Sequence, residues 1–376
     1  MASLTEQEKL TWLALLLAPA GPATLNPLLA ECPDPQQLLQ APPAQARAPF
    51  RTYARNPDWA AAETHLNWLQ QQAIHLIPIT HTSYPALLRR LSDAPIALFV
   101  HGNPDLLHLP QLAVVGSRHA SQNGFATAKQ FGAHLAQHGM AITSGMALGI
   151  DTAAHQGALS VKGHTIAVAG TGLDRVYPAR NHQLAHQIVQ QGALISEYLP
   201  GTKPLRHHFP RRNRVIAGLS LGVLVVEAAL KSGSLITARL ANELGREVFA
   251  IPGSIHNPLA RGCHRLIRQG AKLVETAEHI IEELGAALSE LSLSLEPTSS
   301  ATTEPVSAEL TAEHQTVLDA MGFDPVSIDQ LVQRTGMRAA EVSSILLLLE
   351  LQGQVSPELG GLFQRTQACC QPGRQM

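Results

Sequence analysis

Cysteine and long apolar runs are both scarce in this 376-residue chain, and each scarcity argues against a class of protein. The four cysteines are Cys32, Cys263, Cys369 and Cys370. They form no C-x-x-C pair and no zinc-finger spacing, so we expect a cytoplasmic protein in a reducing compartment. No apolar stretch approaches the roughly 20 residues of a membrane-spanning helix, so no membrane partner is expected. Glu6 and Glu8 precede the apolar run at residues 12–17, which is the wrong charge for an export signal.

The familiar motifs of nucleotide chemistry are also missing. There is no Walker A string, and Gly116-Ser117-Arg118 places a charged side chain where the dinucleotide motif G-x-G-x-x-G needs its second glycine. The segment Gly218-Leu219-Ser220-Leu221-Gly222 matches the hydrolase string G-x-S-x-G. A helical segment precedes it and a strand follows, which is the reverse of a nucleophile elbow. We therefore expect no catalytic residue and no cofactor.

Metal chemistry has little support either. Three pairs stand at i,i+4, namely Asp151 with His155, His134 with His138, and His182 with His186. None has a third ligand at a recognisable spacing, and H-E-x-x-H is absent. The histidines are interpreted as surface residues, Asp151 is interpreted as a residue that caps a helix or orders a loop, and no metal is expected.

Charge is distributed very unevenly along a chain whose formal net charge is only -2 and whose mean hydropathy is +0.03. Residues 106–274 hold 17 Lys and Arg against 6 Asp and Glu, a net charge of +11. The preceding residues carry a net charge of -2, and residues 275–376 carry -11. A basic middle between acidic ends indicates a polyanionic partner for the middle alone.

Hydrophobic periodicity divides the chain into parts. Residues 1–75 read as a helical accessory domain of the SAM or helix-hairpin-helix kind, 76–285 as the main domain, 286–308 as a Ser-, Glu- and Pro-rich linker, 309–366 as a winged helix, and 367–376 as a tail. In the main domain, short apolar runs alternate with amphipathic segments. This pattern predicts an α/β fold with a doubly wound, mostly parallel, Rossmann-like sheet.

The predicted strands of the main domain end in glycine or small polar residues. The five endings are Gly116-Ser117-Arg118, Ser144-Gly145, Gly170-Thr171-Gly172, Glu227 leading to Lys231-Ser232-Gly233-Ser234, and Pro252-Gly253-Ser254. In an open parallel sheet, ligands bind beyond the carboxyl ends of the strands, and helix N-terminal amides attract phosphate oxygens. Tight strand-to-helix turns also use glycine for structural reasons alone. Five such endings together favour an anion-binding edge.

A basic segment that contains an aromatic residue sharpens this expectation. No acid occurs between Glu197 and Glu227, and within that interval lie Lys203, Phe209, Arg211, Arg212, Asn213 and Arg214. Arginine and lysine neutralise phosphates, while an exposed aromatic ring gives a base a surface for stacking. The alternative is that Phe209 belongs to the core and the arginines are merely solvated. A phosphate contact at Arg212 predicts that Arg212→Ala flattens the log–log salt dependence of binding by roughly 0.7.

These residues resemble the DprA/Smf family of DNA-processing proteins of bacterial natural transformation. The strings that carry the resemblance are Val115-Gly116-Ser117-Arg118, Ser144-Gly145-Met146-Ala147-Leu148-Gly149-Ile150-Asp151, Gly170-Thr171-Gly172, Val176-Tyr177-Pro178, Phe209-Pro210-Arg211-Arg212-Asn213-Arg214-Val215-Ile216-Ala217, Lys231-Ser232-Gly233-Ser234-Leu235-Ile236-Thr237-Ala238 and Phe249-Ala250-Ile251-Pro252-Gly253. They cover roughly residues 80–285, in the family's order.

The resemblance implies a core that binds single-stranded DNA without hydrolysing it and delivers the strand to the RecA recombinase past single-strand-binding protein. The DNA contacts it implies are Arg118, Ser144, Gly145, Lys203, Phe209, Arg211, Arg212, Asn213, Arg214, Lys231 and Ser234, with Phe209 touching a base and the arginines holding phosphates. It also implies a homodimer, with Leu266, Ile267 and Leu273 as candidate contacts. An ordinary helix packed on the sheet would explain the same apolar residues.

Two rival functions remain open. Glycine-rich strand ends would also suit a Rossmann-type nucleotide hydrolase of the phosphoribohydrolase kind, although the P-G-G-x-G-T string with its glutamate is absent. A winged helix often reads duplex DNA, which suggests a transcription regulator. From residue 309 to 365, however, there are three arginines against eight acids. That charge opposes phosphate binding, so we expect the winged helix to contact protein or act as a spacer.

Overall fold

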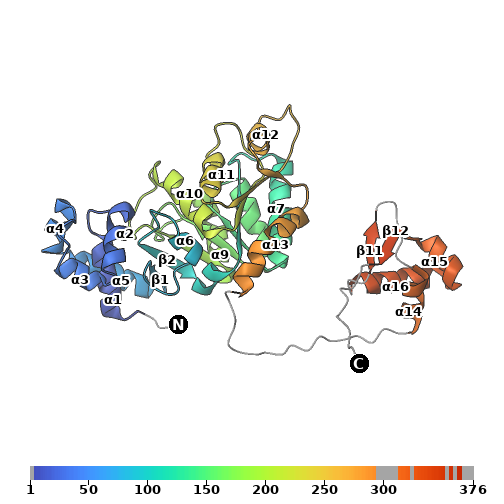
Figure 1. Ribbon diagram of the computed structural model, residues 1–376, viewed down its shortest axis with the longest axis horizontal. Helices are drawn as coiled ribbons and strands as arrows, with labels where there is room; N and C mark the ends of the chain where they lie inside the picture. The colour runs from blue at the N-terminus through green and yellow to red at the C-terminus, as the bar shows by residue number, and fades with distance from the viewer. Residues whose placement is uncertain (1–3, 294–311, 322–325, 352–354, 359–361, 366–376) are drawn as a thin grey trace, which may run out of the picture. The chain divides into compact units, whose positions relative to one another are not determined.

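A computed structural model describes residues 4–293, 312–321, 326–351, 355–358 and 362–365. The chain divides into two compact units, Met1–Glu296 and Pro297–Met376. The first unit contains the sheet that the sequence predicts, together with the N-terminal helices, and the second contains the winged helix (Figure 1). Within the described residues, no helix is both long and apolar enough to cross a membrane.

The sheet of the first unit has nine strands in the spatial order β1-β2-β6-β5-β4-β3-β7-β8-β9. The strands are β1 (His75–Pro78), β2 (Ala97–Gly102), β3 (Gln111–Val115), β4 (Ala141–Ser144), β5 (Thr165–Val168), β6 (Ala193–Ser196), β7 (Gly222–Val225), β8 (Glu247–Ala250) and β9 (Lys272–Leu273). All neighbours from β6 to β9 pair in parallel, whereas β2 pairs antiparallel with both β1 and β6. The predicted doubly wound, mostly parallel sheet is confirmed.

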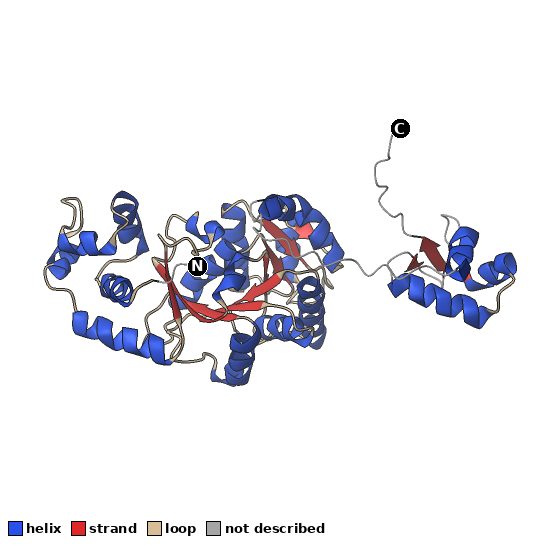
Figure 2. Cartoon of the chain, turned by 90° about the horizontal axis from the view of Figure 1, so that it is seen from below, coloured by secondary structure: helices blue, strands red, loops and turns tan. Residues whose placement is uncertain are grey.

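Helices lie on both sides of this sheet (Figure 2). They are α6 (Ala86–Arg89), η1 (Pro104–His108), α7 (Gln122–Gln137), α8 (Ile150–Ser160), η2 (Ala179–Asn181), α9 (His182–Gln191), α10 (His208–Leu219), α11 (Ser234–Glu243), α12 (Arg261–Arg268) and α13 (Ala277–Leu293). Because side chains alternate along a strand, Leu112 and Val114 of β3 pack with α7, α8 and α13, while Ala113 and Val115 pack with α10 and α11. Burial of both faces explains the continuous apolar strands that the sequence shows.

Strand order fixes where a ligand can approach. After β3 the chain builds β4, β5 and β6 on one side, and then returns to place β7 against the other side of β3. Since β3 to β9 run parallel, their carboxyl ends meet at one edge of the sheet. The direction of winding reverses between β3 and β7, and such a reversal opens a crevice in which α/β proteins bind ligands.

The five N-terminal helices share a hydrophobic core with the sheet. They are α1 (Glu6–Leu16), α2 (Pro22–Glu31), α3 (Pro35–Gln40), α4 (Ala48–Ala54) and α5 (Trp59–Gln71). Their buried side chains, including Leu13 and Phe50, join one cluster with Phe99 of β2 and Leu184 of α9. The helical character of residues 1–75 is therefore as predicted, but these helices do not have a core of their own.

At the other end of this unit, the predicted linker boundary needs a correction. Helix α13 continues to Leu293, past the predicted start of the linker at residue 286. The reason is that apolar residues recur at helical spacing up to Leu291, although serine and glutamate are frequent there. The remainder of the linker, 294–308, and the tail, 367–376, lie outside the described residues.

The second unit has the element order of a winged helix. It contains α14 (Ala312–Met321), β10 (Val326–Ser327), α15 (Ile328–Thr335), α16 (Ala339–Leu351), β11 (Val355–Glu358) and β12 (Leu362–Arg365), with the strands in the order β10-β12-β11. Ser327 caps α15 in a reciprocal capping box with Gln330. Val317, Leu331 and Val342, one from each helix, are buried in its core.

Candidate nucleic-acid interface

Helix α10 carries the basic segment, and its three arginines differ sharply in exposure. Arg212 and Arg214 are each 5% exposed, whereas Arg211 lies on the surface. Pro210 fits the first helical turn, where backbone N–H groups have no partner within the helix. Consecutive helical residues point about 100° apart, so neighbouring arginines face different surroundings. The segment is therefore not one uniform basic patch.

The Arg212 guanidinium lies beneath the strand ends and joins two of their loops. Its Nη1 donates hydrogen bonds to the carbonyl oxygens of Gly145, after β4, and of Val168, at the end of β5. The buried Asp151 carboxylate is its counter-charge and accepts from the amides of Gly145 at 3.1 Å and Ala147 at 3.2 Å. Burial lowers the pKa of Arg212 to about 10, so the group stays charged at neutral pH. The interpretation of Asp151 as a loop-ordering residue is confirmed.

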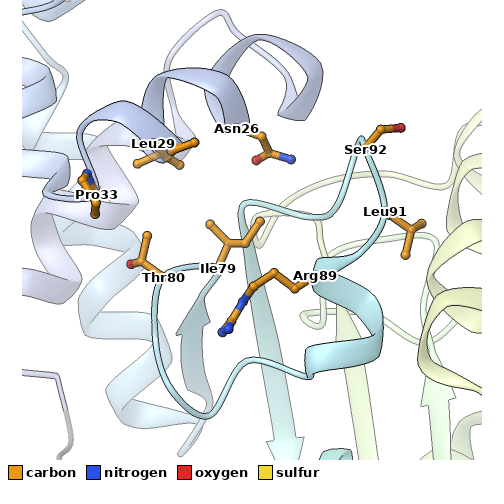
Figure 3. A pocket seen from close by; sticks show the side chains of 9 residues that line it. Asn26, Leu29, Pro33, Ile79, Thr80, Arg89, Leu91 and Ser92 are labelled. Carbon is orange, nitrogen blue, oxygen red and sulfur yellow. The ribbon is translucent and has the colours of Figure 1, made fainter.

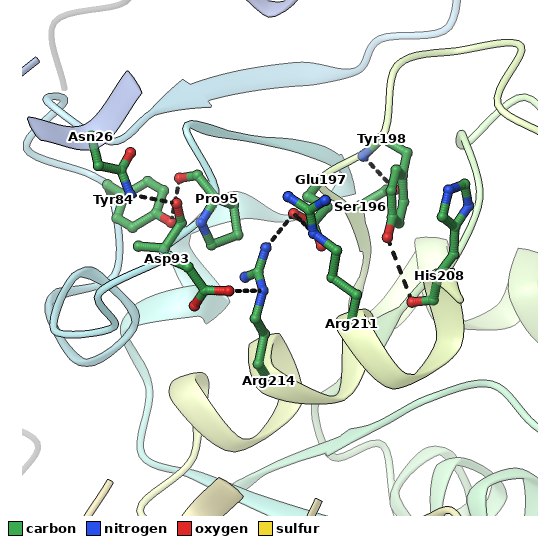
Figure 4. A network of polar contacts seen from close by, with 11 residues as sticks. Asn26, Tyr84, Asp93, Pro95, Ser196, Glu197, Tyr198, His208, Arg211 and Arg214 are labelled. Carbon is green, nitrogen blue, oxygen red and sulfur yellow. Dashed lines mark hydrogen bonds and ion pairs between the residues drawn. The ribbon is translucent and has the colours of Figure 1, made fainter. Parts of the chain in front are cut away.

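Arg214 is engaged in a second internal network, drawn in Figure 4. Its Nη2 donates to Glu197 Oε2 at 2.5 Å, and its Nε lies 3.0 Å from Asp93 Oδ2. Arg211 approaches the same Glu197 oxygen more loosely, with Nε at 3.7 Å. The family resemblance implies that Arg212 and Arg214 hold phosphates. Their guanidiniums are buried against protein partners, so we leave both out of the proposed contact surface.

With those arginines turned inward, Phe209 lies half-buried at the surface beside β5. Its ring packs against Gly170, where an added Cβ would lie 3.1 Å from Phe209 Cδ1. The Tyr177 ring lies beside it, with centroids 5.4 Å apart and planes inclined by 37°. The guanidinium carbon of Arg118 lies 5.9 Å from the Phe209 centroid. Loops after β3 and β5 thus bring a cation to an aromatic pair, a combination suited to a stacked base and its phosphate.

Tyr177 was missed as a site residue by the sequence analysis, which quoted it only within a family string. Its side chain is 51% exposed, which is unusual for a tyrosine beside a phenylalanine. A signal was present, since Tyr177 follows the glycine-rich end of β5 in a chain with only 4% aromatic residues. Its partner Phe209 is 32 positions away in the sequence, so the pairing itself needed the fold.

The start of α11 provides a second polar surface next to α10. Ser232 Oγ and Ser234 Oγ lie 2.7 Å apart across Gly233, and Asn213 Nδ2 donates to the Gly233 carbonyl at 3.4 Å. Lys231 is exposed just before this turn. Asn213 follows Phe209 by one helical turn, so the two side chains share a face of α10. The structure therefore brings together Arg118, Phe209, Asn213 and Lys231 around the switch between β3 and β7, whereas Ser234, also predicted as a contact, is buried.

Two other strand ends are filled by the protein's own carboxylates. Glu227 accepts hydrogen bonds from the amide and hydroxyl of Ser121, at 2.9 and 2.6 Å, and so occupies the N-terminus of α7. Gly124 leaves room for this carboxylate, since an added Cβ would lie 2.3 Å from the Glu227 carboxyl carbon. After β4, Ser144 is buried and donates to Val114 O at 2.6 Å, while the Gly145 amide is used by Asp151. Ser144 and Gly145 thus support the loops from inside.

The remaining predicted contacts are spread over other surfaces. Lys203 is exposed on the segment that leads into α10. Of the candidate dimer contacts, Leu266 and Ile267 of α12 are partly buried against the core, whereas Leu273 is 48% exposed on the edge strand β9.

The histidine pairs are only partly as expected. His138, His182 and His186 are exposed, but the interpretation of His155 as a surface histidine is wrong. His155 is fully buried, its Nδ1 lies 2.6 Å from Thr165 Oγ1, and burial lowers its pKa to about 3. Among the described residues, no group of three His, Cys, Asp or Glu side chains could hold a metal ion.

A pocket of about 460 Å³ opens on another part of the first unit, between α2 and the segment that joins β1 to α6 (Figure 3). Leu29 and Ile79 face each other across it, and Asn26, Thr80 and Arg89 add polar groups. None of the predicted DNA contacts lines this pocket. It is separate from the aromatic and basic surface.

The fold and this surface define a Rossmann-like α/β protein with basic and aromatic side chains at the carboxyl edge of its sheet. The family model for DNA recombination-mediator protein A matches residues 75–285, and that for the DprA winged helix domain matches residues 301–361. The chain belongs to the DprA/Smf family, whose members are DNA recombination mediators.

Individual relatives agree with this assignment. Protein Smf of Escherichia coli is 46% identical over 308 residues, which are 82% of each chain. DNA processing protein DprA of Streptococcus pneumoniae is 52% identical over 200 residues, 53% of this chain and 71% of that protein. The crystal structure of DprA from S. pneumoniae superposes with a TM-score of 0.66 at 40% identity and covers 75% of this chain and 99% of that one.

A Helicobacter pylori relative was solved in work on its single-stranded DNA binding mode. It matches with a TM-score of 0.51 at 32% identity, over 54% of this chain and 94% of that one.

Proposed function

We propose that this protein binds single-stranded DNA at the carboxyl edge of β3, β5 and β7. The observation that carries the proposal is the group formed by Phe209, Tyr177 and Arg118, with two aromatic rings in contact and a guanidinium beside them. A ring can stack on a base only when the base is unpaired and splayed out, so this group favours a single strand over a duplex. The single-stranded DNA studied with the H. pylori relative supports the same choice.

Arg118, Arg211 and Lys231 would hold the phosphates around this group. Lys203, in the segment that precedes α10, would contact a phosphate further along the strand. Asn213 would donate a hydrogen bond beside the start of α11. The strand would then run from β5 towards β7, across the crevice that the reversal of winding opens. The α10 segment along this path contains no acid, which keeps repulsion of phosphates low there.

The proposal includes binding without hydrolysis. Asp151 and His155, an acid and a base one helical turn apart on α8, are both buried. Asp151 is engaged with Arg212 and loop amides, and His155 with Thr165. Neither is placed to reach a scissile phosphodiester bond, which favours a role in binding.

Within the family's function, we infer that the bound strand is delivered to the RecA recombinase past single-strand-binding protein, and that the chain acts as a homodimer. The family's description as recombination mediators supports the first inference. The second is supported by β9, an edge strand of two residues that exposes Leu273. A dimer formed there would leave the carboxyl edge of β3, β5 and β7 open to DNA.

The test is binding of labelled single- and double-stranded oligonucleotides across a salt series, with and without RecA. Single strands should bind more tightly, and Arg118→Ala should flatten the log–log salt slope by roughly 0.7, the amount for one phosphate contact on a single strand. Arg51→Ala, which removes an exposed arginine of α4, is the matched control and should leave the slope unchanged. Equal affinity for both kinds of DNA, or no response to Arg118→Ala, would contradict the proposal.

The winged helix is expected to stay off duplex DNA. Arg338, which directly precedes α16, is held by Glu341 through both Nε and Nη2. The unit from 309 to 365 also carries eight acids. In electrophoretic mobility shifts at moderate salt, residues 309–376 alone should not retard duplex DNA, whereas the full chain should retard single strands. Tight duplex binding by this fragment would show that the acidic surface is not what faces DNA.

A further inference from the structure

The Glu197 carboxylate is shared unequally between two arginines of α10. Both guanidiniums converge on one oxygen, Oε2, with Arg214 at 2.5 Å and Arg211 at 3.7 Å. The other oxygen, Oε1, is buried and has no hydrogen-bond partner within the described part of the chain. The Arg214 side chain is only 6% exposed and has Asp93 as a second partner, whereas the Arg211 side chain is 42% exposed. Arg214 is thus fixed in place, and Arg211 is held loosely.

The buried arginines of α10 hold the helix in place, whereas Arg211 is accessible to a ligand. Arg212 and Arg214 anchor the helix from inside, to the loops after β4 and β5 and to the end of β6. Arg211 lies at the surface on the side of α10 that faces Glu197, and it is one of the proposed phosphate contacts. A phosphate that reaches Arg211 would meet a guanidinium whose present partner, Glu197 Oε2, lies 3.7 Å from Nε, beyond hydrogen-bond distance. Charge-assisted bonds to phosphate are shorter and stronger than such a contact.

We propose that Glu197 is a positioning residue that holds Arg211 while the site is empty, and that a DNA phosphate takes Arg211 from it on binding. This inference rests on the proposed function. In the bound state Glu197 keeps Arg214 as its partner, so its buried charge stays compensated. Glu197 thereby lowers the affinity for DNA in exchange for keeping a cation neutralised until a strand arrives.

Glu197→Gln is the direct test, because it removes the charge and retains the side-chain shape and an acceptor for Arg214. Breaking a half-exposed ion pair opposes binding only modestly, so Glu197→Gln should bind a labelled oligo(dT) about two- to fivefold more tightly than the natural protein. Arg211→Ala should flatten the log–log salt slope by roughly 0.7. In the Arg211→Ala background, the gain from Glu197→Gln should disappear.

Asp93→Asn is the matched control. It removes one carboxylate charge from the same network, where Asp93 contacts Arg214, and it should leave the affinity for oligo(dT) unchanged. Thermal unfolding of each variant shows whether the fold is retained. If Glu197→Gln fails to fold, Arg211→Ala by itself tests the inference. An unchanged log–log salt slope in Arg211→Ala would mean that no phosphate reaches Arg211.

Three results would overturn the inference. These are a Glu197→Gln affinity equal to that of the natural protein, a gain that persists in full without Arg211, and an equal gain from Asp93→Asn. Either of the last two would show that Glu197 acts only through its charge at a distance. Failure of the proposed function looks different, because the natural protein itself would then show no salt-sensitive preference for single strands.

Discussion

Arg212→Ala is expected to lower the free energy of unfolding of the first unit by roughly 3–5 kcal/mol, the range for removing one partner of a buried ion pair. The substitution leaves Asp151 as a buried carboxylate without its counter-charge. It also leaves the Gly145 and Val168 carbonyls without their shared donor. Chemical denaturation of the full chain, followed by far-ultraviolet circular dichroism, measures the change.

Arg211→Ala is the matched control for this effect, since it removes an exposed arginine from the adjacent position. It should change the free energy of unfolding by no more than about 0.5 kcal/mol. Molecules of Arg212→Ala that remain folded should keep the salt slope of the natural protein. A stable Arg212→Ala with a slope flattened by roughly 0.7 would restore the original expectation that this guanidinium holds a phosphate.

Phe209→Ala is expected to weaken binding of single-stranded DNA by about 1–3 kcal/mol, which is roughly five- to 150-fold. The physical reason is loss of the flat surface that Phe209 shares with Tyr177 and Arg118. The phenyl ring carries no charge, so the salt slope should not change. Fluorescence anisotropy of a labelled oligonucleotide across a salt series separates these two effects.

Two further substitutions at the same position separate stacking from packing. Phe209→Tyr keeps an aromatic face and should bind nearly as well as the natural protein. Phe209→Leu keeps apolar bulk against Gly170 but has no aromatic face, so it should behave like Phe209→Ala. Natural affinity in Phe209→Leu would mean that the ring only fills space beside β5.

Sequence periodicity was a good guide to the elements of this protein. Strands β3, β4, β5, β7 and β8 stop at the five strand endings that the sequence predicts, and the predicted winged helix is present. Continuous apolar strands reflect burial on both faces, which is a local property that sequence records. The antiparallel pair β1 and β2 was not predicted. Nor were β6 and β9, and of these four strands only β1 and β9 lie at an edge of the sheet; the pairing of all four depends on contacts distant in sequence.

The sequence predicted the region of the site, but it did not predict which of its arginines are buried and which are exposed. A helical pattern offered one clue, since Arg212 precedes the buried Ile216 and Leu219 by one and two turns and so lies on the inward face. The same spacing sets Arg214 before the buried Ala217 and Gly218, but it does not reveal the partners of Arg214, Glu197 and Asp93, which come from other loops. Likewise, nothing near Glu227 indicates that its carboxylate caps a helix that begins 105 positions earlier, at Gln122.

By itself, the sequence determined the parallel sheet, the glycine-rich edge at its strand ends and the acid-free segment that makes this edge basic. These properties follow from composition and from the spacing of apolar residues along the chain, so they do not depend on long-range contacts. The tertiary structure decided which cations remain free for a partner. It buried Arg212 and Arg214 against protein acceptors and left Arg118 beside the Phe209 and Tyr177 rings. A buried charge must find a partner, and only folding brings together the residues that can provide one.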